Sequence, residues 1–446
     1  MTKVITYGTY DLLHHGHIRL LERAKALGDY LVVGITADGF DQARGKINVK
    51  QSLIERIEGV KATGLADEII VEEYEGQKID DIRRLGIDIF TVGSDWKGHF
   101  DYLNEYCKVI YLDRTQGISS SEIRSESSCL RIGIVGESPI INKFIKECQL
   151  VNGVQISGIF SLDNSFFSEE SIALTKNVTS IDELIKKSDA LYIISHPSQH
   201  YSQIKNAINN QKHVLCESPL SLSNEHWDEL KKLSKKNNVI IADGIKTAYS
   251  TAYNRLLLLT KSGVIGKVMS VDATCTSLSD LERIHQDDLS LAWSSICAWG
   301  PTALLPVFQI LGTDYSTKTI ISLRYHDYDL FTKMSFVYPD SVASIKVGTG
   351  VKSEGELIIS GTKGYIYVPA PWWKTDYFEI RYENPADNKR IFYQLDGEGI
   401  RYEIVSFKRM IEGYKNNYID SKISDAIVNV MNDYYVNKKI TILKND

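Results

Sequence analysis

The chain has 446 residues, of which 43% are hydrophobic, and a formal net charge of −6 at pH 7. This length corresponds to about three domains of ordinary size, with enough apolar residues for a core in each. Charges of both signs are mixed along the chain, so no basic stripe indicates a nucleic-acid partner. No apolar run approaches the ~18 residues of a membrane span, and the first residues are typical of a strand rather than a signal peptide. We therefore expect a cytoplasmic protein without membrane insertion.

The six cysteines are scattered along the chain, and no two of them are spaced as C-x-x-C. This distribution favours buried, reduced thiols over disulfides or a zinc site.

Residues 4–17 predict a short apolar strand, a glycine turn and the start of a helix. A strand's carboxyl end and the next helix's amino end bring backbone N–H groups and a positive dipole end together, which suits a triphosphate. His14 and His17 are spaced to lie on one face of the first helical turn, so both imidazoles can reach one phosphate, and Gly16 leaves room for the nucleotide. An arbitrary H-x-x-H is more often a pair of polar helix-start residues. Here the preceding strand and Asp11 favour a nucleotide site.

The next segments alternate between strands and helices, which predicts a parallel sheet. Strands are expected at residues 30–35, 66–71, 88–92 and 109–112. Asp67, at the start of the third of these, is either a ligand for magnesium or a ribose hydroxyl, or simply a turn residue. Asp95 and Trp96 follow the fourth strand, and we expect them to face the same pocket as His14, because ligands collect at the carboxyl ends of parallel strands.

Two polar segments in this part of the chain carry cations. Residues 43–46 contain Arg44 and Lys46, and such a loop is usually a solvated surface turn. Residues 114–120 begin with Arg114 and continue into glycine and serines, a pattern that predicts a tight turn into a helix N-terminus. The serine alone would be only a helix cap, but Arg114 upstream favours phosphate binding.

Residues 1–126 resemble the cytidylyltransferases of the glycerol-phosphate type. The resemblance rests on Tyr7-Gly8-Thr9-Tyr10-Asp11-Leu12-Leu13-His14, on the histidine pair, and on Arg114-Thr115-Gln116-Gly117-Ile118-Ser119-Ser120. It implies a Rossmann-like enzyme that transfers CMP from CTP to a small polyol phosphate, with Mg²⁺ as cofactor and pyrophosphate as second product, for cell-surface polymer (teichoic acid or capsule) synthesis.

The resemblance also implies roles for individual residues. The implied catalytic groups are His14, His17, Lys46 and Arg114. The implied nucleotide-binding residues are Tyr7, Gly8, Thr9, Asp11, Gly16, Asp67, Asp95, Thr115, Gly117, Ile118, Ser119 and Ser120, with Asp11 and Asp67 as candidate metal ligands. One position departs from the family, because its arginine three residues before Asp67 is Gly64 here. Arg56 and Lys61 are the nearby cations that can supply charge instead, and the acceptor can differ from the usual one.

A polar linker at residues 127–129 separates this domain from a second α/β unit. Strands are expected at residues 130–136, 154–160, 191–195 and 213–217, with a helix starting near Pro139. This alternation predicts a dinucleotide-type parallel sheet in a domain of residues 130–245. Residues 246–446 are rich in strand patterns and end in an amphipathic helix and a short strand.

Residues 130–440 resemble the glucose–fructose oxidoreductase and inositol dehydrogenase family. The resemblance rests on the strand–glycine opening and on residues 195–200, 212–219 and 261–268. It implies a Rossmann domain followed by an α+β domain with a large open mixed sheet, and an NAD(P) site. That site would contain Gly133, Gly136, Ser138, Ser195, Pro197, His200, Glu217 and Pro219.

Several departures from this second family fall on its chemistry. Ser138 and Ile141 stand where the fingerprint's second and third glycines belong. Ser218 replaces the lysine of the family's Glu-Lys-Pro motif, and Ala298 and Thr302, around an expected Trp299–Gly300 turn, replace its later aspartate and histidine. The alternatives are a working NAD(P)-dependent reductase that supplies the polyol, and a retired oxidoreductase that serves as a binding or dimerisation module. The departures favour the second, and we expect a homodimer or larger homo-oligomer.

Three weaker hypotheses complete the analysis. The first unit could be only a nucleotide sensor, but the intact histidine pair argues against this. His285, Asp287 and Asp288 are either a metal site or, more often for such a cluster, a solvated loop. Residues 371–373 and the 25 tyrosines suit apolar packing within the sheet or against a partner without any ligand.

Overall fold

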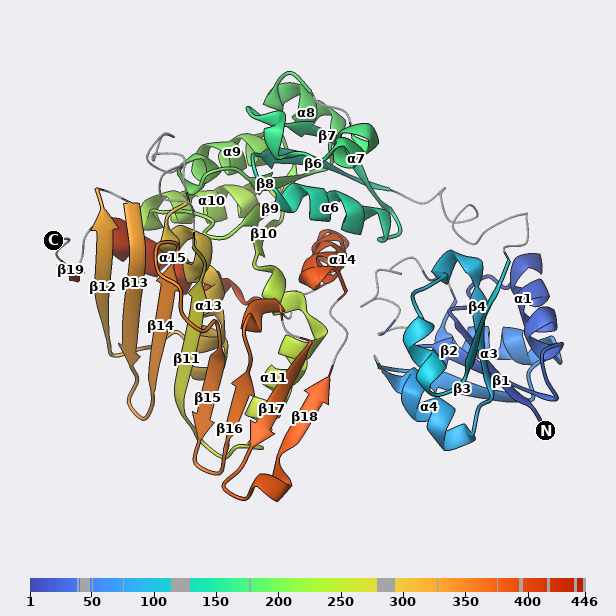
Figure 1. Ribbon diagram of the computed structural model, residues 1–446. Coiled ribbons are helices and arrows are strands. Elements are labelled where there is room, and N and C mark those ends of the chain that lie inside the picture. The colour runs from blue at the N-terminus through green and yellow to red at the C-terminus, as the bar shows by residue number, and fades with distance from the viewer. Residues whose placement is uncertain are drawn as a thin grey trace. The chain divides into compact units, whose positions relative to one another are not determined.

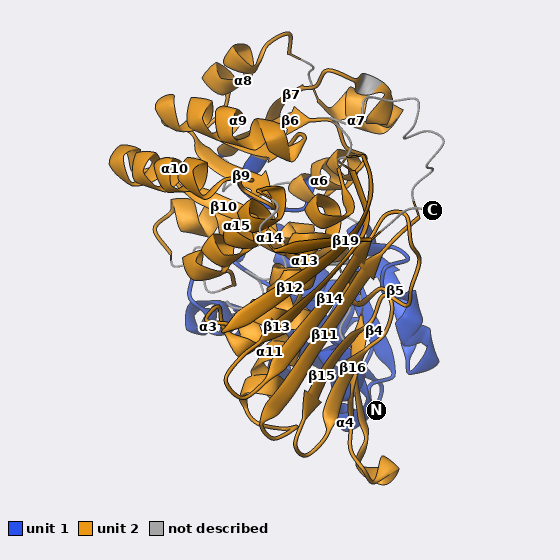
Figure 2. Cartoon of the chain, turned by 90° about the vertical axis from the view of Figure 1, so that its left-hand side faces the viewer, with its two compact units in different colours: residues 1–129, 149–154 blue, residues 130–148, 155–446 orange. Residues whose placement is uncertain are grey.

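The structure is a computed structural model, which describes residues 1–37, 40, 49, 51–74, 76–113, 129–175, 178–278, 293–326, 328–374, 376–392, 396–414, 418–436 and 439–443. The chain forms two compact units, shown in different colours in Figure 2. Unit 1 comprises residues 1–129 with 149–154, and unit 2 comprises residues 130–148 and 155–446.

The described part of unit 1 is built on a five-stranded sheet in the order β3-β2-β1-β4-β5 (Figure 1). Every pair of neighbouring strands is parallel. Its strands are β1 (Lys3–Gly8), β2 (Tyr30–Thr36), β3 (Glu68–Glu72), β4 (Ile89–Gly93) and β5 (Lys108–Leu112). Its helices are α1 (His15–Lys25), α3 (Leu53–Ala62) and α4 (Gln77–Leu85), with 3₁₀ turns η1 (Ser94–Trp96) and η2 (Asp101–Glu105). The strands expected from the sequence are confirmed in this sheet.

The sheet of unit 1 is buried on both faces, as a parallel sheet requires. Val4 and Ile5 are adjacent in β1 and point to opposite faces. Val4 packs in a cluster with Leu21 of α1 and Val60 of α3, whereas Ile5 packs in a second cluster with Ile82 of α4. Helix α3 begins at a capping box formed by Ser52 and Glu55.

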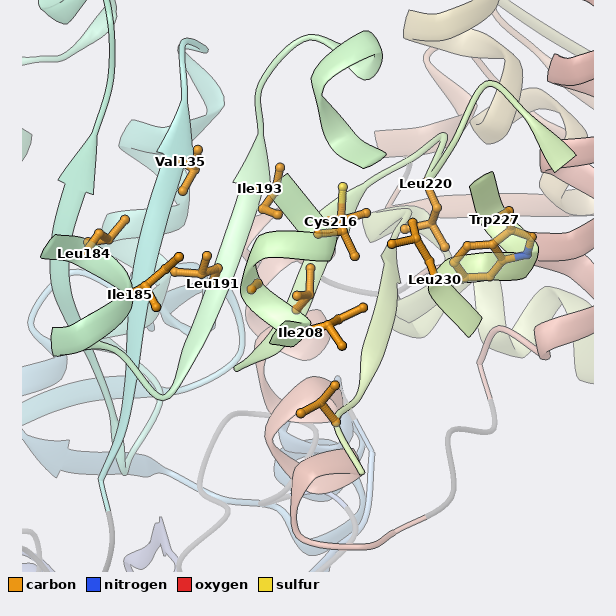
Figure 3. Close-up of a cluster of buried hydrophobic side chains, with 14 of the residues drawn as sticks. Val135, Leu184, Ile185, Leu191, Ile193, Ile208, Cys216, Leu220, Trp227 and Leu230 are labelled. Carbon is orange, nitrogen blue, oxygen red and sulfur yellow. The ribbon is translucent and has the colours of Figure 1, made fainter. Parts of the chain in front are cut away.

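Unit 2 begins with a second five-stranded sheet, ordered β10-β9-β8-β6-β7 in the described residues (Figure 1). The strands are β6 (Leu130–Gly136), β7 (Val154–Phe160), β8 (Ala190–Ile194), β9 (His213–Glu217) and β10 (Ile241–Gly244). The helices are α6 (Ile140–Gln149), α7 (Glu169–Leu174), α8 (Ile181–Lys187), α9 (Pro197–Asn209) and α10 (Asn224–Asn237). In Figure 3, strand residues such as Leu191 and Ile193 pack against Leu184, Ile208 and Leu230 of the covering helices.

The rest of unit 2 is organised around a mixed sheet, nine-stranded within the described ranges, in the order β18-β17-β16-β15-β11-β14-β13-β12-β19. Its strands are β11 (Val268–Thr276), β12 (Thr317–Tyr325), β13 (Tyr328–Val337), β14 (Val342–Gly348), β15 (Leu357–Gly361), β16 (Tyr365–Val368), β17 (Tyr377–Arg381), β18 (Lys389–Phe392) and β19 (Ile440–Leu443). The helices here are α11 (Thr251–Lys261), α13 (Ser295–Leu311), α14 (Ile400–Ile411) and α15 (Ser421–Tyr435). The expected order of two Rossmann-like sheets and one large open mixed sheet is confirmed.

Helix α13 packs against β11, β13 and β14 of the mixed sheet. It contains Trp299 and Gly300, so the turn expected at these residues is wrong. A Cβ on Gly300 would approach the terminal methyl groups of Ile296 and of Met431 in α15 to 2.8 and 2.9 Å, so α13 and α15 pack closely at this residue. Trp372 and Trp373 are buried in the same unit, and Trp372 Nε1 donates to the carbonyl of Thr274 at 3.1 Å.

Two further expectations are tested by the described residues. All six cysteines are free, and four of them are buried. Among the helices that the structure describes, none is both long enough and apolar enough to cross a membrane. His285, Asp287 and Asp288 lie outside the described residues.

Candidate functional site

The order in which strands are added to the sheet of unit 1 reverses between β1 and β4. Strands β2 and β3 lie on one side of β1, and β4 and β5 lie on the other side. In open parallel sheets such a switch point creates a crevice at the carboxyl ends of the two strands, where ligands bind. The loop of residues 9–14, which leads into α1, follows β1 at this edge, and η1 follows β4.

His14 and His17 lie together at the amino end of α1, as the sequence predicts. Their rings stack with centroids 4.0 Å apart and an interplanar angle of 18°. His14 is the N-cap, and its Nδ1 accepts a hydrogen bond from the backbone N–H of Gly16 at 3.1 Å. Because Nδ1 accepts, the neutral ring carries its proton on Nε2, which is then a donor. Tyr10 packs edge-on against His17 at 5.5 Å.

The loop before the histidines is held from several sides. Tyr10 and Leu12 both adopt left-handed φ values, 52° and 49°, which is uncommon for non-glycine residues. Asp11 is completely buried, and its Oδ1 accepts from the backbone N–H of Gln51 at 3.0 Å. The side chain of Gln51 accepts in turn from the N–H of Leu12 at 2.7 Å. Asp11 therefore fixes the conformation of the loop.

Arg56 is a residue whose role the sequence analysis missed. It is only 1% exposed, and its Nη1 donates to the carbonyl oxygens of Thr9 and Thr36, each at 2.8 Å. It therefore joins α3 to the ends of β1 and β2. A signal was present, because Arg56 falls among Leu53, Ile57 and Val60 on the face of α3 that packs inward.

Tyr7 lies inside the protein, so its side chain is not available to a nucleotide. It packs among the core residues between the sheet and α4, and its hydroxyl donates to Asp81 at 2.9 Å. A Cβ on Gly34 would collide with the Tyr7 ring, which explains the glycine in β2. Gly8 leaves space for Tyr10, whose ring a Cβ at Gly8 would approach to 3.0 Å.

Asp67 lies at the edge of the sheet opposite to the histidine pair, although the sequence analysis expected it to bind the nucleotide or a metal ion. It precedes β3, whose residue Glu68 pairs with Val32, so it lies at the amino ends of the strands. Its carboxylate accepts from the backbone N–H of Leu31 at 2.6 Å and pairs with Lys25. The five or six residues of a strand put ~17–20 Å between the two edges. We therefore exclude Asp67 from the nucleotide site and from metal binding.

Asp95 and Trp96 lie at the carboxyl end of β4, in η1, at the expected edge. Trp96 is 38% exposed, and its inner side packs on His99 and Phe100. On the far side of β4, β5 ends at the same edge, and Arg23 of α1 donates to the carbonyl of Asp113 just beyond it at 2.7 Å. Six motif residues after it (Arg114, Thr115, Gly117, Ile118, Ser119 and Ser120) and Lys46 lie outside the described residues.

In unit 2, the residues of the expected dinucleotide site lie at or just beyond the carboxyl ends of β6, β8 and β9, except Gly133, which lies in the middle of β6. Gly136 ends β6 with φ = 135°, and a Cβ there would lie 2.5 Å from the backbone of Ile194 and Ser195. A Cβ on Gly133 would lie 2.5 Å from Ser188 Oγ. Both glycines are thus required by packing within the unit.

The turn after β6 is occupied by side chains where the fingerprint has glycines. Ser138 Oγ accepts weakly from the N–H of Ile140 at 3.5 Å, and Ile141, in the first turn of α6, is completely buried. Between them and β6, Glu137 accepts from the N–H of Leu162 at 2.9 Å. This turn therefore presents a carboxylate and a hydroxyl where a pyrophosphate would need backbone N–H groups.

Ser195, Pro197 and His200 follow β8. Ser195 donates to Gln203, and Pro197 is the first residue of α9. His200 is completely buried, with Nδ1 2.9 Å from the carbonyl of Pro219 and Nε2 2.8 Å from that of Ser195. Burial lowers the pKa of His200 to about 4, against the opposing effect of these two backbone contacts. His200 therefore links the two loops as a structural residue.

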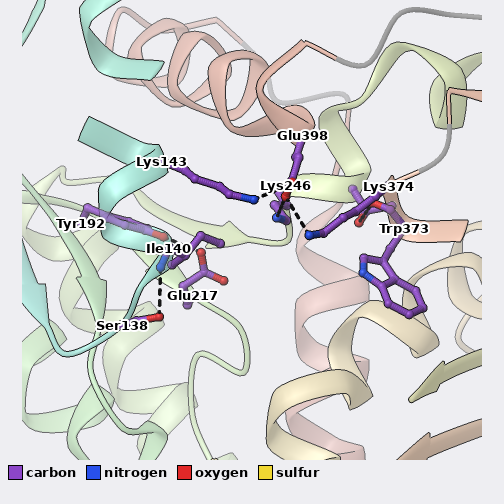
Figure 4. A network of polar contacts seen from close by, with 10 residues as sticks. Ser138, Ile140, Lys143, Tyr192, Glu217, Lys246, Trp373, Lys374 and Glu398 are labelled. Carbon is purple, nitrogen blue, oxygen red and sulfur yellow. Dashed lines mark hydrogen bonds and ion pairs between the residues drawn. The ribbon is translucent and has the colours of Figure 1, made fainter. Parts of the chain in front are cut away.

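Glu217 ends β9 and accepts from the hydroxyl of Tyr192 at 2.6 Å (Figure 4). Burial raises the pKa of Glu217 to about 7, against the opposing hydrogen bond of Tyr192 and the charge of Lys246. Glu403 of α14 is 1% exposed, and neither of its carboxyl oxygens has a hydrogen-bond partner. Burial raises its pKa well above the ordinary value, and the charge of Glu217 adds to the effect. Ser218 follows Glu217 and is buried.

The fold and the edge geometry define a nucleotide-binding α/β protein joined to a dinucleotide-type unit. Residues 5–126 match the cytidylyltransferase-like family model, and residues 130–244 match the oxidoreductase family with an NAD-binding Rossmann fold. The chain belongs to the cytidylyltransferase-like family, and unit 1 is a nucleotidyltransferase of that family.

Unit 1 aligns with nearly the whole length of two curated relatives. Glycerol-3-phosphate cytidylyltransferase from Bacillus spizizenii is 50% identical over 130 residues, which is 29% of this chain and 100% of the relative. The Staphylococcus aureus enzyme of the same name is 46% identical over 131 residues, 28% of this chain and 95% of the relative.

Unit 2 has more distant relatives. Glucose-6-phosphate 3-dehydrogenase from Bacillus subtilis is 26% identical over 156 residues, 34% of this chain and 44% of the relative. A 3-ketoreductase from Actinomadura kijaniata, solved with NADP and TDP-benzene, aligns with a TM-score of 0.63 at 12% identity, covering 71% of this chain and 99% of that one. At this identity the likeness establishes the fold.

Proposed function

We propose that unit 1 transfers CMP from CTP to a small polyol phosphate of the glycerol phosphate type, giving a CDP-polyol and pyrophosphate. The observation that carries this proposal is the stacked pair His14 and His17 at the amino end of α1, at the switch point of the sheet. The product is an activated donor of a polyol phosphate, and we assign it to the synthesis of a cell-surface polymer such as a teichoic acid or capsule.

In the proposed reaction a phosphate oxygen of the polyol phosphate attacks the α-phosphorus of CTP. The bond from that phosphorus to the bridging oxygen breaks, and pyrophosphate leaves with the electron pair. The nucleophile is already an anion, so no base is needed, and the protein contributes positioning and neutralisation of charge. His14 donates from Nε2, because its Nδ1 is engaged by Gly16, and His17 donates beside it. The dipole of α1 adds positive potential at the same place.

The other proposed contacts surround this pair. Gly8, Thr9 and Gly16 bring backbone close to the triphosphate, and Asp11 holds the loop in shape. The exposed face of Trp96 suits stacking on the base or ribose, with Asp95 next to it. Lys46, Arg114, Thr115, Gly117, Ile118, Ser119 and Ser120 are proposed as further nucleotide contacts from the sequence alone.

We propose that Mg²⁺ binds together with CTP. Among the described residues, no group of three or more His, Cys, Asp or Glu side chains is arranged to hold a metal ion. Asp67 does not fit, since it lies at the opposite edge, and Asp11 is the one candidate ligand kept. Mg²⁺ commonly binds phosphates with one or two carboxylates and several waters, and it would offset the charge that repels an anionic nucleophile.

The acceptor is tested with the intact chain, CTP, Mg²⁺ and a panel of polyol phosphates, with pyrophosphate release as the readout. A three-carbon polyol phosphate is expected to be the best acceptor. Release with ATP in place of CTP, or no release with any polyol phosphate, would contradict the proposal.

For unit 2 we propose an oxidoreductase fold that has lost its chemistry and serves as a binding or dimerisation module in a homo-oligomer. The proposed domains are residues 1–126, a linker at 127–129, a Rossmann domain at 130–245 and an α+β domain at 246–446. Hydride transfer to a ketone needs a proton for the new alkoxide, and Ser218, Ala298 and Thr302 cannot deliver one. The alternative is an active NAD(P)-dependent reductase that supplies the polyol.

The two alternatives for unit 2 differ in a direct assay. The full chain is titrated with NADH and NADPH and then offered sugar and polyol ketones. We expect weak binding, because Ser138 and Glu137 occupy the turn where the pyrophosphate would lie, and no turnover. Micromolar affinity together with turnover near the enzyme median of about ten per second would establish the reductase instead.

A further inference from the structure

Three lysines from separate elements of unit 2 converge on one carboxylate. Lys143 lies in the first turn of α6, Lys246 begins the 3₁₀ turn η4 (Lys246–Tyr249), and Lys374 ends η5 (Trp372–Lys374). Their ammonium nitrogens lie 2.6, 2.7 and 3.2 Å from the carboxylate oxygens of Glu398 (Figure 4). We call the three lysines the lysine cradle.

The lysine cradle carries more positive charge than Glu398 can neutralise. Burial opposes ionisation of Glu398, but hydrogen bonds from Lys143 and Lys246 and the charge of Lys374 lower its pKa to about 2, so it contributes one full negative charge. The carboxyls of Glu217 and Glu403 also interact with the charge of Lys246. Burial raises the pKa values of both, so they add less negative charge than a fully ionised carboxylate would. An excess of positive charge therefore remains at neutral pH.

Glu398 lies in a short segment whose backbone is left-handed. Gly397, Glu398 and Gly399 have φ values of 59°, 53° and 90°, so three consecutive residues are left-handed, and Glu398 is the one for which this conformation is unfavourable. A Cβ on Gly399 would collide with the carbonyl of Lys246. The left-handed segment thus brings one carboxylate into the lysine cradle.

The lysine cradle also lies where a ligand of this fold would be expected. Lys143 follows β6 and Lys246 follows β10, at the carboxyl edge of the parallel sheet. Trp373, beside Lys374 in Figure 4, is buried, and its indole N–H has no hydrogen-bond partner. Three convergent ammonium groups, with an unsatisfied buried donor in the residue before Lys374, fit an oxygen-rich anion.

We propose that Lys143, Lys246 and Lys374 form a binding site for the phosphate group of a small phosphorylated molecule, and that Glu398 occupies this site until the phosphate displaces it. A phosphate monoester offers three acceptor oxygens and close to two negative charges, which matches three ammonium groups better than one carboxylate does. The proposal concerns unit 2 alone and does not depend on the reaction proposed for unit 1.

The test uses the full chain and inorganic phosphate as the probe, at constant ionic strength maintained with chloride. The change is Glu398→Gln, which leaves the three lysines without their counter-ion. We expect a lower unfolding temperature of unit 2 in chloride, recovery on adding phosphate, and an affinity for phosphate on the order of tenfold above wild type.

Two further variants test whether the gain in phosphate affinity comes from the lysine cradle. Asp340→Asn removes a carboxylate that pairs with Lys267 at 2.8 Å on the mixed sheet, changes the charge equally, and is expected to behave as wild type. Lys374→Met in the Glu398→Gln background removes one lysine and is expected to abolish the gain, which excludes phosphate binding by unit 1 as its source. A wild-type phosphate response in Glu398→Gln, or a gain that persists without Lys374, would overturn the proposal.

A single variant in the wild-type background covers the case in which Glu398→Gln does not fold. Lys374 is 37% exposed, so Lys374→Met is tolerated more easily. It is expected to need on the order of tenfold more phosphate for the same stabilisation of unit 2. An unchanged phosphate requirement would equally contradict the proposed site.

Discussion

Arg56 Nη1 donates to the carbonyl oxygen of Thr9 at 2.8 Å, and this bond anchors the loop that presents the histidine pair. Arg56 touches no proposed substrate position, so it acts by positioning. Replacing it by methionine removes two buried hydrogen bonds, to the carbonyl oxygens of Thr9 and Thr36. We expect Arg56→Met to lower the free energy of unfolding of unit 1 by about 2–4 kcal/mol. Chemical denaturation measures this change.

The matched control is Lys61→Met, on the same helix but exposed. It removes the same charge and is expected to leave both stability and nucleotidyl transfer near wild type. Arg56→Met is also expected to reduce kcat more than the affinity for CTP, because a displaced loop misplaces transition-state donors. An effect on CTP affinity alone would indicate that Arg56 binds the nucleotide directly.

His14→Ala and His17→Ala are expected to reduce nucleotidyl transfer by on the order of a hundredfold or more each. Both side chains are proposed to donate to oxygens on which charge grows in the transition state. Pyrophosphate release measures the rate, and circular dichroism checks the fold. His15→Ala is the matched control, since His15 is exposed and its Nε2 only accepts from Arg19 at 3.4 Å. Rates within a few-fold of wild type in both variants would remove the histidines from the mechanism.

Asp67→Asn tests the placement of this residue at the amino edge of the sheet. A backbone hydrogen bond from Leu31 and the pairing with Lys25 lower the pKa of Asp67. A lowered folded-state pKa stabilises the protein above the unfolded-state value of about 4, and this contribution is lost as the pH falls through the folded-state pKa. We expect Asp67→Asn to be less stable than wild type at pH 7, with the difference shrinking below pH ~4. The KM for CTP should stay at the wild-type value, and a large rise would return Asp67 to the nucleotide site.

Glu403→Gln tests the buried carboxyl group of unit 2. The folded-state pKa of Glu403 is raised, so the folded protein keeps a proton that the unfolded chain releases above about pH 4.3. Stability therefore falls as the pH rises from that value through the folded-state pKa. We expect Glu403→Gln to flatten this dependence between pH 5 and 8. Glu412→Gln, at the C-cap of the same helix and paired with Lys408, should keep the wild-type slope.

The sequence by itself determined the strands of the two parallel sheets, their order of appearance and the turn that we propose binds the nucleotide. These features are local: β-branched runs predict buried strands, and a glycine turn followed by His14 and His17 predicts a helix start with both rings on one face. The replacement of glycines by Ser138 and Ile141 is equally local. Sequence order alone, however, could not tell which polar residues lie at which edge of the sheet.

The tertiary structure decided the roles that depend on distant partners. Asp67 pairs with Lys25, 42 positions earlier, and Arg56 binds the carbonyl of Thr9, 47 positions away, because strand direction and helix packing bring them together. The lysine cradle joins Lys143 to Glu398 across 255 positions. No periodicity or motif encodes such contacts, since they arise only when separately folded elements dock and buried charges must find partners.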